Sequence, residues 1–391
     1  MRSPQCKTPK KKIMQLRKLL FVFMALITAS HSFAQQAPVP PELAAKSWLL
    51  LEMGSGQMLT STKPDERLEP ASLTKLMTAY LTFKALQQKT IAVDQPLPVS
   101  EKAWRTGGSK MFIRVDTQVP VDDLIKGMIV QSGNDACVTL AEGIAGSEEN
   151  FAQMMNREAQ RLGMKNSNFT NSTGLPDPQL YTTARDLSLL ASALIRDFPE
   201  YYKKYYSMKE FRYNNITQPN RNRLLFIDPS VDGVKTGHTE AAGYCLISSS
   251  LRGPRRLISV VVGTASDNAR AQESLKLLNH GFQNFDAVRL YAKNQALSEL
   301  RVYKGSSRML KAGFTEDFII SVPKGAAERI QVELVSQQPL IAPLQIGQRV
   351  GTLKLTLDGQ PLGEYGVQAL ENITVAGFFG RIWDAILLFF Q

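Results

Sequence analysis

At residues 70–81 the chain reads PASLTKLMTAYL, and this stretch combines a helix start with two side chains of complementary chemistry. Apolar residues recur at helical spacing as far as Leu86, and a proline followed by a serine is typical of a helix N-terminus. Positions three apart share one face of a helix, so Lys75 is expected beside the hydroxyl of Ser72. The pattern predicts a serine nucleophile with an amine as its general base.

A lysine acts as a base only in its neutral form, although its reference pKa is about 10.4. Burial of the amine, the positive end of a helix dipole and a second ammonium group all lower the pKa of a lysine. Lys235 is the candidate for that second cation if the fold brings it into the same cleft as Lys75. The same Ser-x-x-Lys spacing recurs at Ser321 and Lys324, but there it lies beside a proline in a strand-like region, and we assign it no chemistry.

Two further motifs follow in order, Ser132-Gly133-Asn134 and Lys235-Thr236-Gly237. In a cleft shared with the nucleophile, the Ser132 hydroxyl is expected to relay a proton to the leaving amine. Asn134 is expected to hold both the amide of the substrate and the lysine base. A serine acyl-transfer site assembled in this way is complete without histidine.

The motif Lys235-Thr236-Gly237 is expected to bind the substrate. Lys235 and Thr236 are expected to bind a carboxylate, and Gly237 to keep the strand edge open to a substrate backbone. His238 follows directly, and we assign an oxyanion hole to its backbone N–H together with that of Ser72. We assign no role to the ring of His238.

Composition disfavours other hydrolytic chemistries. Beyond residue 34 the sequence holds only His238 and His280, and it contains neither a Gly-x-Ser-x-Gly elbow nor a His-Glu-x-x-His zinc helix. A histidine triad and a zinc centre are therefore disfavoured, and we predict no metal and no cofactor. His280 is interpreted as packing near a helix end.

The charge of the chain is uneven. Its first 34 residues contain seven Lys or Arg and no acid, and the remaining 39 basic side chains nearly balance the 35 acidic ones. With no basic run interleaved with aromatics, nucleic acid is not an expected partner. The basic start leads into an apolar run, Leu19 to Ile27, within an uncharged stretch of roughly 16 residues, which is shorter than the about 20 of a spanning helix. It predicts a secretory signal peptide, residues 1–34, cleaved after Ala34.

The 391 residues suffice for two domains. Strand-like residues 47–52 are followed by a glycine turn at 54–56, and the periodicity predicts helices at 72–86, 121–130, 134–144, 148–162 and 184–195 and strands at 244–249 and 257–262. Helices flanking a central sheet predict an α/β or α+β domain, which we bound at 35–289.

Beyond about Arg289 alternation dominates. Residues 330–334 and 353–357 alternate apolar with polar side chains, and the second run is closed by Asp358-Gly359, a hairpin signature. We therefore predict a small all-β domain at 290–372, with no chemistry visible in it.

Residues 373–391 are predicted to form an amphipathic helix. From Phe378 onward large apolar side chains cover one half of the helix and Arg381 and Asp384 fall on the other, with Leu388 as an exception. Fourteen residues with two charges cannot span a bilayer, but a helix rich in Trp and Phe can lie in its interface. A helix docked on the protein's own core is the alternative. We favour the membrane, which for a secreted protein is the outer, periplasmic face of the cytoplasmic membrane.

Cys137 and Cys245 are the two cysteines beyond residue 34. Small thiols pack well in cores and this spacing indicates no disulfide framework, so two buried free thiols are favoured and a disulfide is the alternative.

The three motifs, 60 and 103 residues apart in this order, resemble those of the penicillin-recognising serine enzymes, which share Ser-x-x-Lys, Ser-x-Asn and Lys-Thr-Gly. Within that group residues 132–134, 171–176, 183–187 and 235–239 look like those of the low-molecular-mass D-alanyl-D-alanine carboxypeptidases. The β-rich second domain and the terminal amphipathic helix match that family too, so the resemblance covers essentially the whole mature chain.

The resemblance implies a serine β-lactamase/transpeptidase-like catalytic domain. It implies removal of the terminal D-alanine from the pentapeptide stem of peptidoglycan through an acyl-enzyme, and acylation of the same serine by β-lactams. By motif the carried-over roles are Ser72 as nucleophile, Lys75 as base, Ser132 and Asn134 as relay and support, and Lys235 as carboxylate partner. By position Arg270 resembles the family's arginine that helps hold the substrate carboxylate, whereas a solvent-facing arginine is the default interpretation.

Three alternatives remain. A class A β-lactamase uses a glutamate for deacylation, and residues 162–176 contain no acid, so efficient β-lactam hydrolysis is not expected. An endopeptidase of peptidoglycan crosslinks would share every catalytic residue, and the β-rich domain and anchor favour the carboxypeptidase only by analogy. A non-catalytic envelope protein that binds β-lactams would show decayed motifs, and here all three motifs are intact.

Overall fold

The computed structural model describes residues 38–389, so the predicted signal peptide lies outside the described residues. The first domain is built on an antiparallel sheet with the strand order β2-β1-β9-β8-β7. The strands are β1 (Ser47–Glu52), β2 (Gln57–Thr62), β7 (Val231–Thr239), β8 (Gly243–Arg252) and β9 (Arg255–Thr264). The predicted strands 244–249 and 257–262 are confirmed as the central parts of β8 and β9.

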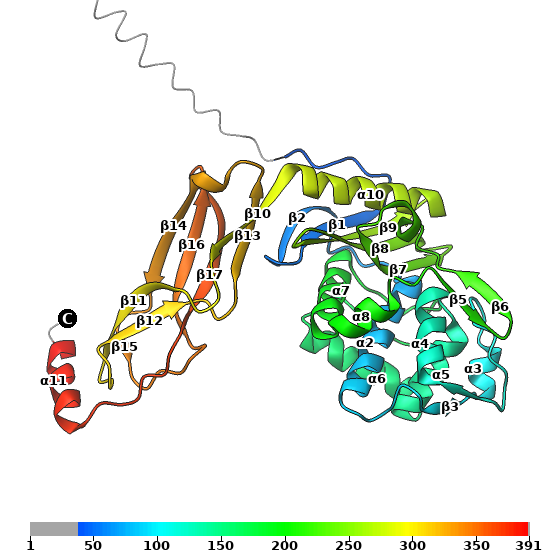
Figure 1. The fold of residues 1–391 in the computed structure, drawn as a ribbon, viewed down its shortest axis with the longest axis horizontal. Coiled ribbons are helices and arrows are strands. Elements are labelled where there is room, and N and C mark those ends of the chain that lie inside the picture. The colour runs from blue at the N-terminus through cyan, green and yellow to red at the C-terminus, as the bar shows by residue number, and fades with distance from the viewer. Residues whose placement is uncertain (1–37, 390–391) are drawn as a thin grey trace, which may run out of the picture. The chain divides into compact units, whose positions relative to one another are not determined.

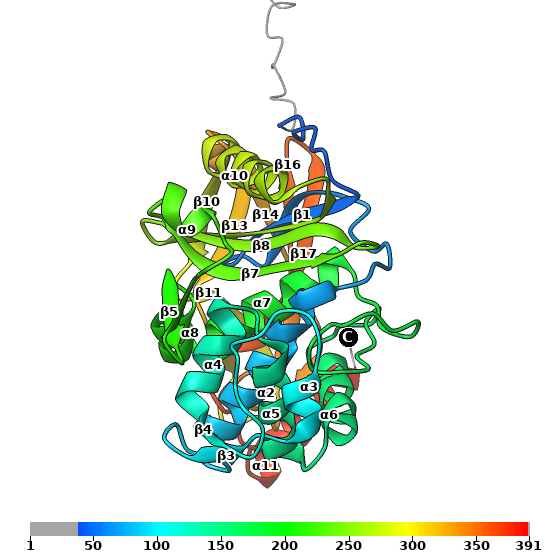
Figure 2. The same ribbon diagram turned by 90° about the vertical axis from the view of Figure 1, so that its right-hand side faces the viewer.

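Helices cover both faces of this sheet (Figures 1 and 2). α10 (Asp267–Asn284) packs on one face against β8 and β9, and α7 (Ala184–Asp197) packs on the other against β1 and β9. The side chains of β1 alternate between the two layers, because Trp48 and Leu50 join the core beneath α10 while Leu49 joins the core beneath α7. A strand buried on both faces has apolar residues in succession, which explains the unbroken WLLL of β1.

The remaining helices form a lobe around α2 (Lys75–Gln87). All five predicted helices are confirmed, with one difference: Ala71–Thr74 form a 3₁₀ turn, η1, and the α-helix proper begins at Lys75. The lobe also contains α3 (Glu101–Arg105), α4 (Val121–Val130), α5 (Asn134–Ala145), α6 (Glu148–Arg161), α8 (Pro199–Tyr205) and the hairpins β3 (Pro96–Pro98) with β4 (Gln118–Pro120) and β5 (Glu210–Tyr213) with β6 (Ile216–Pro219). The short helix α9 (Leu224–Ile227) lies outside this lobe, because it contacts β7 and its leucines join the core beneath α10.

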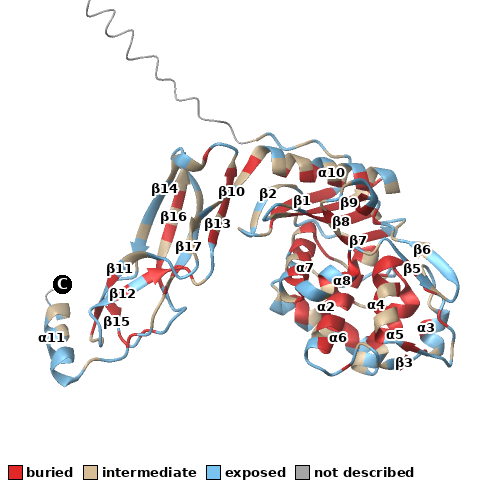
Figure 3. Cartoon of the chain, in the orientation of Figure 1, coloured by how far each residue is buried: buried red, intermediate tan, exposed pale blue. Residues whose placement is uncertain are grey.

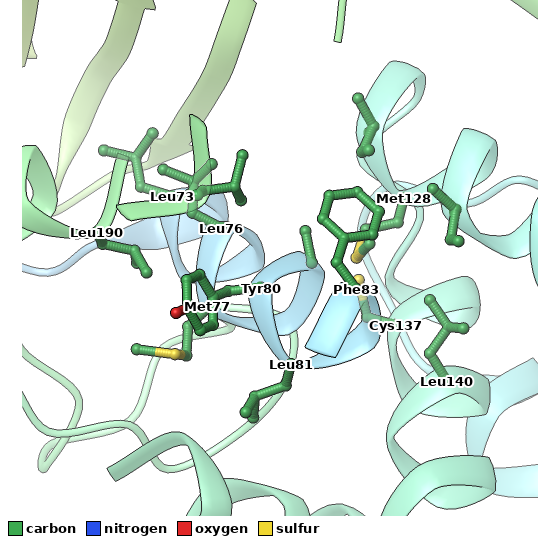
Figure 4. Close-up of a cluster of buried hydrophobic side chains, with 14 of the residues drawn as sticks. Leu73, Leu76, Met77, Tyr80, Leu81, Phe83, Met128, Cys137, Leu140 and Leu190 are labelled. Atoms are coloured by element: carbon green, nitrogen blue, oxygen red, sulfur yellow. The ribbon is translucent and has the colours of Figure 1, made fainter. Parts of the chain in front are cut away.

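α2 is buried on every side, as the burial colours of Figure 3 show. Only Lys84 and Gln87 of its residues reach solvent. In Figure 4 its apolar side chains point outward in several directions, toward Leu140 of α5 and toward Leu190 of α7. A helix that is apolar all round belongs in a core. Lys75, at its N-terminal end, is thereby carried into the interior.

The second domain is all β and has its own apolar core. β10 (Phe285–Tyr291) pairs with β13 (Phe318–Pro323), and the other strands form a sheet in the order β14-β16-β17-β12-β11-β15. β structure therefore starts at Phe285, directly after α10, rather than at the predicted boundary of residue 290. The remaining strands are β11 (Ala296–Tyr303), β12 (Met309–Gly313), β14 (Ile330–Ser336), β15 (Leu340–Ile341), β16 (Arg349–Leu357) and β17 (Gln360–Ala369).

The predicted hairpin at Asp358-Gly359 is confirmed between β16 and β17. Both residues adopt positive φ, 53° and 78°, as a type I′ turn requires. The predicted apolar face of residues 330–334 is confirmed only in part, because β14 is an edge strand and Val332 is 44% exposed.

The last described element is α11 (Phe378–Phe389), which lies within the predicted terminal segment. Its aromatic side chains are exposed, with Phe379 at 85% and Trp383 at 59%. Within residues 38–389, no helix has the length and apolar character needed to cross a membrane.

Candidate active site

The Ser72 hydroxyl and the Lys75 amine lie together, as the helical spacing predicts. Lys75 Nζ lies 2.7 Å from Ser72 Oγ, and it donates a second hydrogen bond to the carbonyl of Thr173 at 2.6 Å. Lys75 is 1% exposed, so the predicted burial is confirmed. The two contacts hold the amine against the hydroxyl, which is the geometry that a general base needs.

Burial lowers the pKa of Lys75 to about 8, because the surrounding apolar side chains solvate its charge poorly. The guanidinium of Arg221 also lowers this pKa, whereas the carboxylate of Asp135 raises it. An amine with such a pKa is partly neutral near pH 7 and can accept a proton from the serine.

Lys235 is the second buried cation of the site. Its Nζ donates to Ser132 Oγ at 2.9 Å and to the carbonyl of Thr236 at 3.1 Å. Burial lowers the pKa of Lys235 well below its usual range, and the charges of Lys75 and Arg221 lower it further. The two buried ammonium groups repel each other, which disfavours the charge on both lysines, and the guanidinium of Arg221 lowers the pKa of both lysines as well.

Ser132 lies in the turn between α4 and α5 with a φ of 62°, in the left-handed region. A non-glycine residue held there costs about 1–3 kcal/mol, and such strain is concentrated at functional sites. The turn brings the Ser132 hydroxyl to Lys235, so the two motifs that the sequence places 103 residues apart meet in one contact.

Asn134 is placed differently from our expectation. Its Nδ2 donates to the carbonyl of Gly107 at 2.7 Å, and Lys75 is instead held by Thr173. The predicted support of Lys75 by Asn134 is therefore corrected to a backbone carbonyl. Its Oδ1 is buried and has no hydrogen-bond partner among residues 38–389, so this oxygen is available to the N–H of a substrate amide.

A cavity of about 460 Å³ opens at this place. Among the predicted site residues it is lined by Ser72, Ser132, Thr236, Gly237, His238 and Arg270. Lys75, Asn134 and Lys235 are nearly fully buried, and the two lysines contact the lining serines. The remaining lining residues are Ser109, Asn220, Arg221, Arg223, Tyr244 and Asp267.

Arg270 is a buried member of this cavity, so the default interpretation of a solvent-facing arginine is wrong. It is 5% exposed, it donates to the carbonyl of Gly237 at 3.2 Å, and it forms an ion pair with Asp267. The side chain comes from the first turn of α10, which begins at Asp267, shortly after β9 ends at Thr264. Its charge lies at the end of the cavity where we expect the carboxylate.

Gly237 allows β7 to approach the nucleophile closely. A Cβ at this position would lie 3.2 Å from both the Pro70 carbonyl oxygen and the Leu73 side chain. The glycine therefore makes room for the turn that carries Ser72, in addition to its predicted role toward the substrate. His238 is exposed, and its ring lies 4.0 Å from that of Tyr244, centroid to centroid.

Thr173 and Arg221 both act on Lys75, and our sequence reasoning gave neither of them a role, although residues 171–176 were matched to the family. Thr173 acts through its backbone carbonyl, which has no side-chain signature. Arg221 comes from an irregular segment just before α9, and no periodic pattern connects it with the three motifs.

The remaining predictions concern residues outside the cavity. Ser321 lies on β13 of the second domain, with its Oγ 3.4 Å from Ser55 Oγ, and it does not line the cavity. His280 lies near the C-terminal end of α10, as interpreted. Cys137 and Cys245 are both buried free thiols, which confirms the favoured interpretation.

The chain is similar in sequence to known serine carboxypeptidases, which agrees with the serine and lysine geometry of the cavity. A family model described as D-alanyl-D-alanine carboxypeptidase matches residues 33–266, and one described as the C-terminal domain of penicillin-binding protein 5 matches residues 285–375. D-alanyl-D-alanine carboxypeptidase DacA of Haemophilus influenzae is 41% identical over 374 residues, covering 94% of this chain and 95% of the relative.

Two solved structures extend the comparison. Penicillin-binding protein 5 from Haemophilus influenzae superimposes with a TM-score of 0.81 at 42% identity, over 86% of this chain and 99% of that one. Penicillin-binding protein D2 from Listeria monocytogenes in its ampicillin-bound form gives a TM-score of 0.58 at 30% identity, over 62% and 99%. This chain therefore belongs to the D-alanyl-D-alanine carboxypeptidase family of penicillin-binding serine enzymes, and it is a serine-type carboxypeptidase.

Proposed function

We propose that the carboxypeptidase reaction proceeds through an acyl intermediate on Ser72, with neutral Lys75 as the base. The observation that carries this proposal is the 2.7 Å separation of Lys75 Nζ and Ser72 Oγ within a buried setting. Lys75 takes the hydroxyl proton while Oγ attacks the carbonyl carbon between the two terminal D-alanines of a peptidoglycan pentapeptide. The ammonium group so formed donates to the Thr173 carbonyl, a charge-assisted contact.

Ser132 delivers the proton that the leaving amine requires. Its Oγ lines the cavity together with Ser72 and contacts Lys235 at 2.9 Å. As the tetrahedral intermediate collapses, the C–N bond breaks, the amine of D-alanine takes the Ser132 proton, and the proton held by Lys75 restores the hydroxyl. Water then hydrolyses the ester on Ser72 with the same groups acting in reverse.

The cationic end of the cavity binds the terminal carboxylate. Lys235, Thr236 and Arg270 supply its donors, and an ammonium and a guanidinium form stronger bonds with a carboxylate than neutral donors do. The Oδ1 of Asn134, which has no partner in the described part of the chain, accepts the N–H of the substrate amide. The backbone N–H groups of Ser72 and His238 form the oxyanion hole.

The test follows D-alanine release from a muramyl pentapeptide and the mass of the protein after added penicillin. We expect release, and a penicilloyl adduct that Ser72→Ala abolishes. Ser321→Ala is the matched control, because it removes the serine of the other Ser-x-x-Lys copy, and it should leave both signals intact. A persistent adduct on the Ser72→Ala protein would contradict the assignment of the nucleophile. An adduct without D-alanine release would indicate an endopeptidase of crosslinks or a binding protein.

We further propose that the chain is exported, cleaved after Ala34, and held by α11 on the periplasmic face of the cytoplasmic membrane. The exposed Phe379 and Trp383 support this proposal, since large aromatics favour the bilayer interface. Removal of residues 376–391 should release an active enzyme from the membrane fraction. Unchanged retention of the truncated protein would exclude the interfacial helix.

A further inference from the structure

Glu148 is a carboxylate outside the cavity that the reaction scheme does not use. It lies at the start of α6, is 9% exposed and does not line the cavity around Ser72. Its Oε1 accepts two hydrogen bonds from one residue, from Ser172 N at 3.0 Å and from Ser172 Oγ at 2.7 Å. Its Oε2 lies 3.0 Å from Lys102 Nζ.

Glu148 holds the segment of residues 171–174, and this segment contacts the lysine base. Ser172 is followed by Thr173, whose carbonyl accepts the hydrogen bond from Lys75 Nζ at 2.6 Å. The carbonyl of Ser172 itself accepts from Thr78 Oγ1 of α2 at 2.6 Å. The segment is therefore fastened at Ser172 both to α6 by Glu148 and to α2 by Thr78, one residue before the contact with Lys75.

The segment has little freedom to move elsewhere. Asn171 Oδ1 accepts from Thr173 N at 3.1 Å and from Gly174 N at 2.7 Å, which folds the backbone into a tight turn. Gly174 packs so closely that a Cβ there would lie 1.7 Å from the Ala71 carbonyl oxygen. The position of the Thr173 carbonyl is thus determined by a few hydrogen bonds, two of which end on Glu148.

We propose that Glu148 is a positioning residue that sets the basicity and direction of Lys75 through Ser172 and Thr173. The inference rests on the proposed role of Lys75 as the base. A carbonyl oxygen 2.6 Å from Nζ stabilises the ammonium form more than the neutral amine, and it also directs the lone pair of the amine toward Ser72. If the carbonyl shifts, Lys75 becomes a weaker base and its lone pair is misdirected.

The variants at Glu148 differ in whether they keep the hydrogen-bond acceptor and the charge of the side chain. Glu148→Ala removes the acceptor of both Ser172 donors, and a buried donor without a partner drives the segment to rearrange. Glu148→Gln keeps an amide oxygen for both donors while removing the charge. Glu149→Ala is the matched control, because the side chain of Glu149 is 72% exposed and also pairs with Lys102, at 2.8 Å, but does not contact Ser172 in the contacts described above.

The experiment measures the second-order rate constant of penicillin acylation against pH with the full chain. For Glu148→Ala we expect a plateau at least tenfold lower and a rising limb whose midpoint moves to lower pH, because the pKa of Lys75 falls. Glu148→Gln and Glu149→Ala should keep both the plateau and the midpoint close to those of the parent protein. Ser172→Ala, which loses one of the two donors, should show the same changes in smaller measure.

Three outcomes separate the possibilities. A lower plateau with an unchanged midpoint in Glu148→Ala would mean a loss of folded protein only, and would overturn the proposal. An equal midpoint shift in Glu148→Gln would assign the effect to the charge instead of the position, and would also overturn it. Should Glu148→Ala not fold, Ser172→Ala decides by the same two readouts. Acylation that survives Ser72→Ala would instead contradict the proposed function.

Discussion

Asp267 and Arg270 form an ion pair one helical turn apart at the start of α10. The same guanidinium donates to the carbonyl of Gly237 at 3.2 Å, on the strand that carries Lys235. These contacts fix the Arg270 charge at the end of the cavity before any substrate arrives. A preset charge loses little side-chain entropy when a carboxylate binds, which favours binding.

Replacement of Arg270 should therefore weaken substrate binding more than it slows chemistry. A hydrogen bond to a charged group contributes roughly 1.5–3 kcal/mol, so Arg270→Gln should lower kcat/KM about 10- to 100-fold, mainly through KM. Arg223→Gln is the control, because Arg223 also lines the cavity and lies 3.8 Å from Asp267 but has a half-exposed side chain. Its effect should be several-fold smaller. Equal effects of the two variants on D-alanine release would show that general positive charge, and not Arg270, selects the carboxylate.

The pH dependence of acylation should report Lys75. Because burial lowers the pKa of Lys75 to about 8, the amine is mostly charged below that pH and mostly neutral above it. Only the neutral form accepts the Ser72 proton, so the rate constant of penicillin acylation should rise with pH and level off above a midpoint near 8. Stopped-flow or quenched mass measurements over this range check the prediction. A rate that is flat across pH 7 to 9 would exclude Lys75 as the titrating base.

Loss of the Ser132 hydroxyl should impair proton delivery. General acid catalysis contributes typically 10²- to 10⁴-fold, and Ser132→Ala should lower kcat for D-alanine release by about 10²-fold or more. Lys235 keeps its contact with the Thr236 carbonyl in this variant, so the binding end of the cavity persists. Ser109→Ala removes another hydroxyl that lines the same cavity and should change kcat far less. Similar losses in the two variants would argue against a specific relay.

Local sequence patterns predicted the helices and the hairpin turn, because the residues that determine these elements are neighbours in the sequence. The five helices were found from apolar spacing, and the type I′ turn from Asp358 and Gly359, whose backbone conformation few other residues adopt easily. The pairing of Ser72 with Lys75 was predictable for the same reason, because the two residues are three positions apart in one helical turn.

The parts that were missed depend on contacts between distant segments. Asn134 was expected to hold Lys75, but the Thr173 carbonyl fills that place, and a backbone group leaves no mark in the sequence. Arg270 could be assigned to the substrate carboxylate only through its resemblance to the family's arginine, because its burial depends on where α10 starts relative to β7. Glu148 falls outside the 162–176 window that we searched for an acid, although the fold brings it to Ser172.

Gly174 should tolerate no side chain. Its φ is +83°, and a Cβ there would lie 1.7 Å from the Ala71 carbonyl oxygen, directly beside the nucleophile's turn. Gly163 is a matched control with a φ of +80° and open space around it. Gly163→Ala should lower the free energy of unfolding by about 1–2 kcal/mol, the cost of the left-handed backbone alone. Gly174→Ala should lower it by clearly more and should also slow penicillin acylation. Equal unfolding free energies in the two variants, measured with denaturant, would contradict the close contact.

Each exposed aromatic side chain of α11 should contribute separately to the binding of the protein to the membrane. Phe379 is 85% exposed, and burial of one such side chain in an apolar medium contributes about 1.5–3 kcal/mol, so Phe379→Ser should weaken binding to lipid vesicles at least tenfold. Phe226 on α9 is 53% exposed, and Phe226→Ser removes a comparable side chain from the catalytic domain. Flotation of the control variant should match that of the parent protein, and D-alanine release should be unchanged in both variants. Full retention of Phe379→Ser on vesicles would mean that α11 does not insert this face, and the contact with the membrane would have to be sought elsewhere on the chain.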